Sequence, residues 1–90
     1  MAEPEVHQDA ASGRYLLRLD GRDIGEAVYE DTDEGRVFVH TAVEPELQHH
    51  GYGTQLVREA LDDTRAANLK PIGRCPMVAD FMAEHPEYAG

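Results

Sequence analysis

Two closely spaced glycines, Gly51 and Gly53, divide this sequence into halves with different hydrophobic patterns. Before them, short apolar segments, one alternating with polar residues, are separated by turn residues, as in β-strands. After them, apolar residues recur on one helical face from Leu56 to Ala67. A chain of 90 residues with strands first and helices second fits one α+β domain.

Three strand candidates precede the glycines: Arg14–Leu19, Ile24–Glu30 and Arg36–Val43. The dipeptide Asp20-Gly21 is typical of a two-residue hairpin turn. Short connections predict that the three strands form an antiparallel meander. Residues 1–13 contain few apolar side chains, so we expect a flexible N-terminal tail there and a single domain over residues 14–90.

The second half predicts a helix, a short fourth strand and a C-terminal helix. Asn68 is suited to end the first helix in a left-handed conformation. Lys70–Cys75 is the strand candidate, and Pro76 suits the first turn of the following helix. The apolar side chains of that helix share one face; they are Met77, Val78, Phe81 and Met82.

The charge balance excludes one class of partner. The chain has 18 acidic and 8 basic residues, a formal charge of -10, so we expect no nucleic-acid binding through a basic face. Solubility or adaptation to salt explains the acidity better than attraction of a cationic substrate. No apolar run is long enough to cross a membrane, and we expect no membrane partner. A single cysteine, Cys75, and an acidic N-terminus without a signal-peptide pattern indicate a cytoplasmic protein.

The segment from Gln48 to Thr54 follows a strand and opens a helix, which suits phosphate binding. The first N–H groups of a helix lack internal partners, and the helix dipole places partial positive charge there. Gly51 and Gly53 would let a ligand approach the backbone closely. Alternatively, the two glycines only shape a corner between strand and helix, and the spacing alone does not decide between these readings.

A resemblance favours the phosphate site. The segment Gln48-His49-His50-Gly51-Tyr52-Gly53 resembles the acyl-CoA signature Gln/Arg-x-x-Gly-x-Gly/Ala of the GCN5-related N-acetyltransferase superfamily. The lead-in Val43-Glu44-Pro45-Glu46-Leu47 is similar as well. Over residues 14–88 the chain resembles a family of short single-domain acetyltransferase-like proteins; the segments that carry this are His40-Thr41, Cys75-Pro76-Met77-Val78 and His85-Pro86-Glu87-Tyr88.

The resemblance implies a truncated form of the superfamily fold that binds acetyl-CoA or coenzyme A. The strand before the turn would splay from its neighbour, the pantetheine arm would pair with that strand, and the pyrophosphate would meet the backbone of the turn. The implied cofactor contacts are Thr41, Ala42, Val43, Gln48, His49, His50, Gly51, Tyr52, Gly53 and Thr54. Ala42 departs from the short family, which often has a glutamate there.

Two residues are candidates for catalysis of acetyl transfer to an amine, on a small molecule or a protein lysine. His40, which we place on a strand face with Phe38 and Ala42, could accept a proton from an ammonium group near neutral pH. Cys75 lies at a helix N-terminus, where a thiol's pKa can fall, and the resemblance carries over a catalytic suggestion for it. A buried cysteine packed as a small apolar side chain is the alternative.

Other functions stay open at this stage. The alternative from a different class is a coenzyme A-binding or protein-interaction module with little or no turnover, as a monomer or weak homodimer. A third possibility is an α+β domain with no nucleotide site. We expect no metal, because the spacing of His49, His50, Cys75 and His85 fits no standard ligand pattern.

Overall fold

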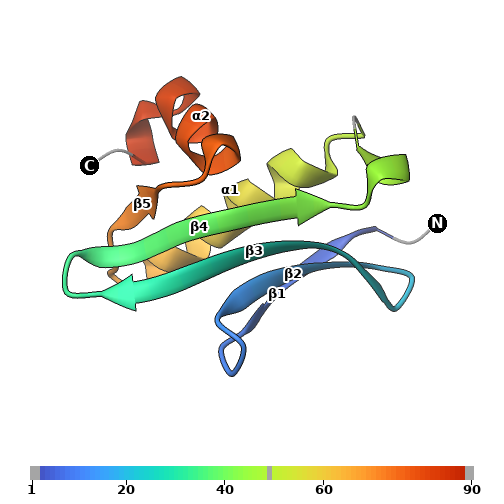
Figure 1. Ribbon diagram of the computed structural model, residues 1–90, viewed down its shortest axis with the longest axis horizontal. Coiled ribbons are helices and arrows are strands. Elements are labelled where there is room, and N and C mark those ends of the chain that lie inside the picture. The colour runs from blue at the N-terminus through green and yellow to red at the C-terminus, as the bar shows by residue number, and fades with distance from the viewer. Residues whose placement is uncertain (1–2, 49, 89–90) are drawn as a thin grey trace.

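The computed structural model describes residues 3–48 and 50–88 (Figure 1). The strands are β1 (Glu5–Asp9), β2 (Arg14–Leu19), β3 (Arg22–Thr32), β4 (Gly35–Val43) and β5 (Pro71–Gly73). The helices are α1 (Tyr52–Ala66) and α2 (Pro76–Glu84), with single 3₁₀ turns at Pro45–Leu47 and Pro86–Tyr88. The sheet order is β1-β2-β3-β4-β5, with β1 to β4 antiparallel and β5 parallel to β4. The predicted α+β class is confirmed.

Local turn chemistry accounts for three of the element boundaries. Asp20 and Gly21 both have positive φ, 53° and 79°, as the hairpin turn between β2 and β3 requires. Asn68 follows α1 with φ 62°, and Pro76 occupies the first turn of α2. These three features were expected from the sequence and are confirmed.

The expectation of a flexible tail over residues 1–13 is wrong for Glu5–Asp9. Glu5–Asp9 forms edge strand β1, which pairs with β2 from Glu5↔Arg18 to Asp9↔Arg14. Val6 packs against the core, and the Gln8 side chain donates a hydrogen bond to the Tyr29 hydroxyl at 2.7 Å. An edge strand needs few apolar residues, because its backbone groups pair with the neighbouring strand. The meander therefore has four strands.

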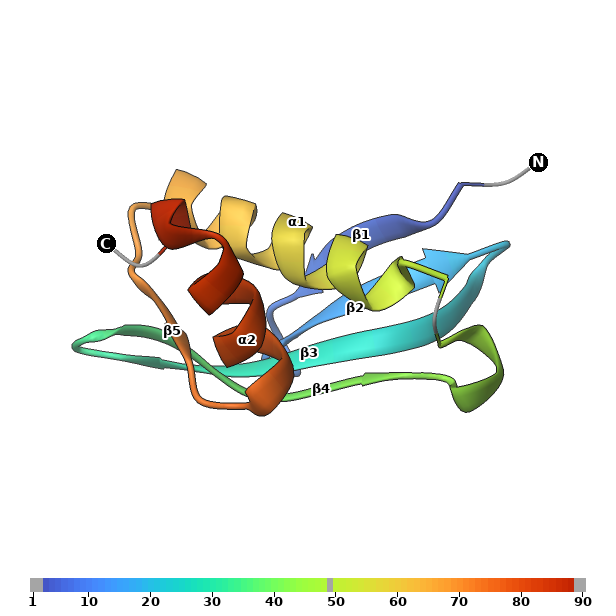
Figure 2. The same cartoon turned by 90° about the horizontal axis from the view of Figure 1, so that it is seen from above.

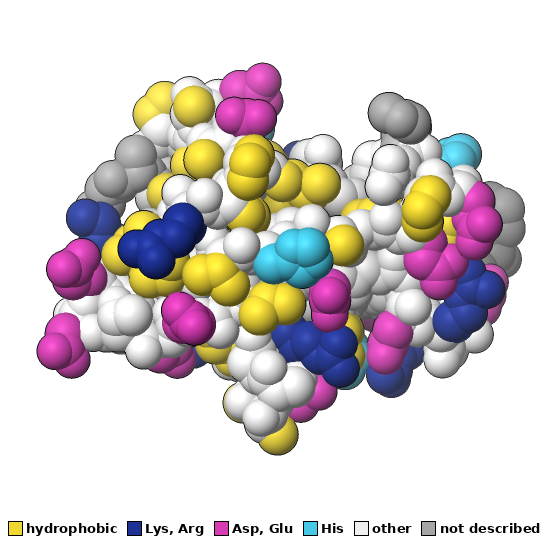
Figure 3. Space-filling model, in the orientation of Figure 1, with side chains coloured by type: hydrophobic (Ala, Val, Ile, Leu, Met, Phe, Trp, Pro, Cys, Tyr) yellow, Lys and Arg dark blue, Asp and Glu magenta, His cyan; other side chains and the backbone are white. Residues whose placement is uncertain are grey.

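Both helices cover the same face of the sheet, as Figure 2 shows. The core between these two layers contains side chains from β2, β3, β4, α1 and α2. Its fully buried members include Tyr15, Leu17, Phe38, Leu56, Leu61 and Val78. The opposite face of the sheet is not covered by a helix, and Figure 3 shows it with apolar, charged and histidine side chains at the surface.

A β-bulge between β3 and β4 decides which face His40 occupies. Tyr29 pairs with Phe38 but Val28 pairs with His40, so β4 has one extra residue at this point. Phe38 is therefore buried under the helices, whereas the His40 side chain lies on the uncovered face and is 60% exposed. Our placement of His40 on one face with Phe38 was wrong, because simple alternation does not anticipate a bulge.

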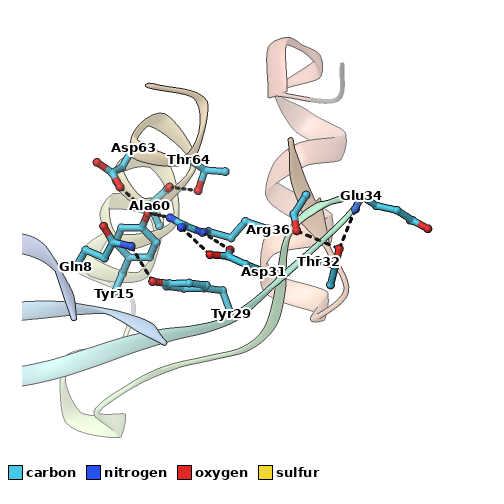
Figure 4. A network of polar contacts seen from close by, with 11 residues as sticks. Gln8, Tyr15, Tyr29, Asp31, Thr32, Glu34, Arg36, Ala60, Asp63 and Thr64 are labelled. Carbon is cyan, nitrogen blue, oxygen red and sulfur yellow. Dashed lines mark hydrogen bonds and ion pairs between the residues drawn. The ribbon is translucent and has the colours of Figure 1, made fainter. Parts of the chain in front are cut away.

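A buried polar network fixes the end of the sheet where β4 begins (Figure 4). Arg36 is 6% exposed and donates to both carboxylate oxygens of Asp31, at 2.7 and 3.0 Å. It also donates to the Tyr15 hydroxyl at 2.7 Å and stacks over the Tyr29 ring, with 4.2 Å from guanidinium carbon to ring centre. The Tyr15 hydroxyl in turn donates to Asp63 of α1 at 2.6 Å. The network thus ties three strands to α1.

The electrostatics of this network follow from its contacts. The hydrogen bond from Arg36 holds the pKa of Asp31 below its ordinary value and raises the pKa of Arg36 itself. Burial and the hydrogen bond to Asp63 raise the pKa of Tyr15 to about 12. Within the described residues, no buried side-chain nitrogen or oxygen lacks a hydrogen-bond partner. At this end of the molecule, the buried polar side chains therefore satisfy one another's hydrogen bonds.

Candidate cofactor-binding site

The site begins where β4 and β5 separate. β5 pairs with β4 only from Arg36 to Phe38. The backbone N–H groups of Arg74 and Cys75 then both donate to the Phe38 carbonyl at 3.0 Å, and the chain turns into α2. From Val39 to Val43, β4 therefore has no strand partner on that side in the described structure. The splayed strand that the resemblance implied is present.

The bulge also sets which backbone groups point into the gap. The Val43 carbonyl accepts a hydrogen bond from the Gln48 side chain at 3.1 Å, while the next residue, Glu44, donates to the Ile24 carbonyl on the β3 side. The backbone N–H and C=O groups of Val43 therefore point away from β3. Pairing is regular from His40 to Val43, so alternation gives Thr41 the same direction. The Thr41 backbone N–H and C=O groups therefore face the gap between β4 and α2.

The start of α1 presents N–H groups beside this gap that have no partner among the described residues. The helix has no side-chain cap, and its first bond runs from Gln55 N–H to the Gly51 carbonyl at 3.0 Å. Gly51 has φ 80°, a left-handed conformation that glycine adopts without strain. At Gly53, a Cβ atom would lie 3.5 Å from the Met77 sulfur and 3.6 Å from Val43, so glycine keeps this position open.

These elements enclose a cleft of about 410 Å³. Its wall is formed by the end of β4, the turn, the first turns of α1 and one face of α2. The lining residues are Val43, Gln48, Gly51, Gly53, Thr54, Val57, Met77, Asp80, Phe81 and Glu84. This described lining contains apolar side chains, backbone donors and two carboxylates, but no Lys or Arg.

The residues predicted to bind the cofactor do not all share this cleft. Five of them line it: Val43, Gln48, Gly51, Gly53 and Thr54. Ala42 lines a separate depression of about 340 Å³ that includes residues of the uncovered sheet face, such as Arg14 and Glu26. His50 and Tyr52 lie outside the lining, with their ring centres 5.8 Å apart. His49 falls outside the described residues.

The two catalytic candidates lie on opposite faces of the sheet. Thr41 and His40 are consecutive on β4, so their side chains point in opposite directions. Thr41 Oγ1 lies 3.3 Å from Cys75 Sγ on the helix-covered face, where Cys75 is 7% exposed and precedes α2. His40 Nε2 lies 3.8 Å from a Glu26 carboxylate oxygen on the uncovered face. The structure therefore does not bring His40 and Cys75 together.

Half of the cleft wall was not predicted as a site. The additional residues are Val57, Met77, Asp80, Phe81 and Glu84. The four on α2 stand at helical spacing i, i+3, i+4 and i+7, so periodicity places them on one face. What the sequence does not reveal is that this face lies opposite the first turn of α1. Met77, which the sequence places on the apolar face of this helix, is 42% exposed and lines the cleft.

Comparisons with known proteins agree with this architecture. Residues 14–90 match the sequence profile of the GCN5-related N-acetyl-transferase family, and the chain belongs to that family. A search of curated proteins finds no match. Among solved structures, the chain is similar to N-acetylglutamate synthase from Neisseria gonorrhoeae, a structure complexed with coenzyme A and N-acetyl-glutamate.

That structural similarity establishes the fold. The TM-score is 0.65 and the sequence identity 22%, over 90% of this chain but only 21% of the synthase chain. The protein thus corresponds to about a fifth of the larger molecule. None of the helices in residues 3–48 and 50–88 is long and apolar enough to cross a membrane. The same residues contain no group of three or more His, Cys, Asp or Glu side chains placed to hold a metal ion.

Proposed function

We propose that the cleft binds acetyl-CoA and that the protein is an acetyltransferase for amine acceptors. The observation that carries the proposal is a coincidence of three features in a chain of this family. The edge of β4 is open, the start of α1 is uncapped, and a cleft of about 410 Å³ joins them. In the similar synthase structure, coenzyme A is bound to a protein of the same fold.

The residues of the turn and of the β4 edge fit the pyrophosphate and the pantetheine arm of such a ligand. Uncapped N–H groups at Tyr52, Gly53 and Thr54 would hold phosphate oxygens, aided by the dipole of α1. The Thr41 backbone groups would pair with the amides of the pantetheine arm. Met77 and Phe81 would cover that arm with apolar surface. When bound, acetyl-CoA supplies an acetyl group activated as a thioester.

The protein's own contribution would be positioning, oxyanion stabilisation and proton transfer. A backbone N–H on the open edge of β4 would donate to the oxygen that gains negative charge when the amine attacks. We assign the proton acceptor to His40, with Glu26 beside it, for an acceptor that approaches from the uncovered face of the sheet. Cys75 is the second candidate, on the cofactor side.

Two variants separate these roles. His40→Gln is expected to lower kcat roughly 100-fold, since general base catalysis contributes about that much. Cys75→Ser should retain turnover if the amine attacks the thioester directly. Mass spectrometry after incubation with acetyl-CoA checks this second point: an acetyl group on Cys75 during turnover would instead indicate a covalent step.

The proposal as a whole is tested by titration with coenzyme A. Backbone amide NMR signals from Thr41 to Thr54 are expected to shift, while those of the Arg36 network stay in place. If about millimolar coenzyme A, which corresponds to only about 4 kcal/mol of binding, leaves all signals unmoved, the proposal is wrong. The remaining interpretation would then be an α+β domain with no nucleotide site.

A second candidate function is a coenzyme A-binding or interaction module with little turnover. The chain matches only 21% of the synthase chain, so the synthase's activity does not carry over as a whole. The discriminating assay follows release of the coenzyme A thiol with a panel of polyamines and lysine-rich peptides. Binding without acceptor-dependent release would support the module.

A further inference from the structure

The α2 wall of the cleft has the wrong charge for a polyphosphate ligand. Asp80 and Glu84 line the cleft, are exposed, and take part in no ion pair within the described residues. No lysine or arginine lines it. The nearest basic residue along α1 is Arg58, one turn beyond Thr54 and outside the lining.

Phosphate binding at this site would therefore depend on backbone N–H groups and uncharged side chains such as Thr54, without a cation in the described lining. The α1 N-terminus offers a small number of N–H groups, enough for one phosphate or pyrophosphate group. Coenzyme A carries a further phosphate on its ribose, with a charge of about -1.5 to -2 near neutral pH, as for other phosphate monoesters. The described lining contains no cation for that phosphate, and it contains two carboxylates. The chain as a whole has a formal charge of -10.

We infer that Asp80 and Glu84 make the cleft select against anionic charge, so that the 3′-phosphate of coenzyme A weakens binding instead of strengthening it. The inference rests on the proposed function, because it concerns the ligand of the same cleft. The protein recognises the pyrophosphate and the pantetheine arm and does not recognise the 3′-phosphate. It binds 3′-dephospho-coenzyme A more tightly than coenzyme A.

The physical basis is Coulomb repulsion across a solvent-accessible cleft. Charges within about 10 Å interact appreciably at moderate ionic strength, and salt screens them beyond that distance. α2 is 9 residues long, so Asp80 and Glu84 lie within one turn of each other along a wall of the cleft. Each is expected to weaken binding of a doubly charged phosphate roughly two- to fivefold at low salt.

The experiment compares two ligands on four proteins. Dissociation constants for coenzyme A and 3′-dephospho-coenzyme A are measured by calorimetry at low salt for the wild type, Asp80→Asn, Glu84→Gln and the control Glu34→Gln. Glu34→Gln also removes one exposed charge, but Glu34 lies on the β3–β4 hairpin and does not line the cleft.

The expected result is that wild type binds the dephospho ligand more tightly than coenzyme A. Asp80→Asn and Glu84→Gln should each tighten coenzyme A binding roughly two- to fivefold, with a smaller gain for the dephospho ligand. Glu34→Gln should change neither constant. The gains should shrink as ionic strength is raised to about 0.3 M.

Failure of this inference and failure of the proposed function give different results. If the wild type binds coenzyme A as tightly as its dephospho form or more tightly, or if the two neutralised variants bind like wild type, the inference is overturned while the cofactor site stands. If neither ligand binds any of the four proteins, the proposed function itself fails. The two side chains are exposed, so loss of folding is not expected to obscure the comparison.

Discussion

The two ends of β4 satisfy their polar groups in opposite ways. At its start, Arg36, Asp31, Tyr15 and Asp63 form hydrogen bonds among themselves, and β5 pairs with the strand. At its other end, around Val43, the edge away from β3 has no strand partner among the described residues, and α1 begins without a side-chain cap. The first end is completed by the protein, and the second leaves backbone donors that a ligand could use. Under the proposed function, stability and binding therefore depend on different ends of one strand.

This separation predicts that the largest loss of stability comes from substitutions at the start of β4, in the Arg36 network. Arg36→Met keeps much of the side-chain volume but removes the cation that holds Asp31 and contacts Tyr15. We expect the free energy of unfolding to fall by about 2–3 kcal/mol, below the loss for a fully buried pair because Asp31 is 52% exposed and can regain water. Urea denaturation measures this value.

The matched control for Arg36 is an exposed arginine on the same sheet. Arg18 pairs with Asp23 at 3.0 Å, with both side chains 43% exposed. Arg18→Met is expected to cost less than about 1 kcal/mol. Equal losses for the two variants would show that burial of the Arg36 network is unimportant, and a change in coenzyme A affinity for Arg36→Met would show that the two ends are coupled.

For substitutions beside the Val43 end of β4, we expect the reverse pattern: coenzyme A binding is lost and stability is kept. Gly53 is in the first turn of α1, and its missing side chain leaves space between Met77 and Val43. Gly53→Leu is expected to fill the cleft and weaken coenzyme A binding roughly tenfold or more, about 1.4 kcal/mol. Stability should stay level or rise by about 0.5–1 kcal/mol, since leucine favours the helix more than glycine does.

A smaller substitution at the same position provides the control. In Gly53→Ala, the added Cβ meets its neighbours at ordinary contact distances of 3.5 Å and more. Alanine should therefore disturb binding much less than leucine while giving a similar gain in helix propensity. Calorimetric titration and thermal unfolding of both variants test this. If leucine leaves the affinity unchanged, the cleft between α1 and α2 is not where the cofactor lies.

The contrast between the ends also explains which features could be predicted from the sequence. The Asp20-Gly21 hairpin, the Asn68 stop and the Pro76 helix start depend on local backbone preferences, so they could be recognised directly. The turn around Gly51 could be recognised as the start of a helix and proposed as a phosphate site, because a helix start has a fixed chemistry. Features that depend on packing between distant segments were not accessible in this way.

Three such features were missed, each for a different physical reason. Strand β1 forms through pairing with β2 instead of through its own apolar pattern. The bulge beside Val28 reverses the side-chain alternation, which moved His40 to the uncovered face. Asp80 and Glu84 became cleft residues only through the packing of α2 near the start of α1. Long-range register and helix placement therefore limited the prediction more than local propensity did.

The smallest expected effect concerns Asp31, the acidic partner of Arg36 at the start of β4. The hydrogen bond from Arg36 lowers the pKa of Asp31 in the folded state, so Asp31 contributes stability above its unfolded pKa, near 3.8, and loses it as the pH falls through the lowered folded value. Asp31→Asn should cost at most about 1 kcal/mol at neutral pH, because the side chain is half exposed. The difference from wild type should vanish in acid. Unfolding measured from neutral pH downward tests this, with Asp33→Asn on the same hairpin as the control. A cost for Asp31→Asn that does not change with pH would mean that the ion pair to Arg36 is not its source.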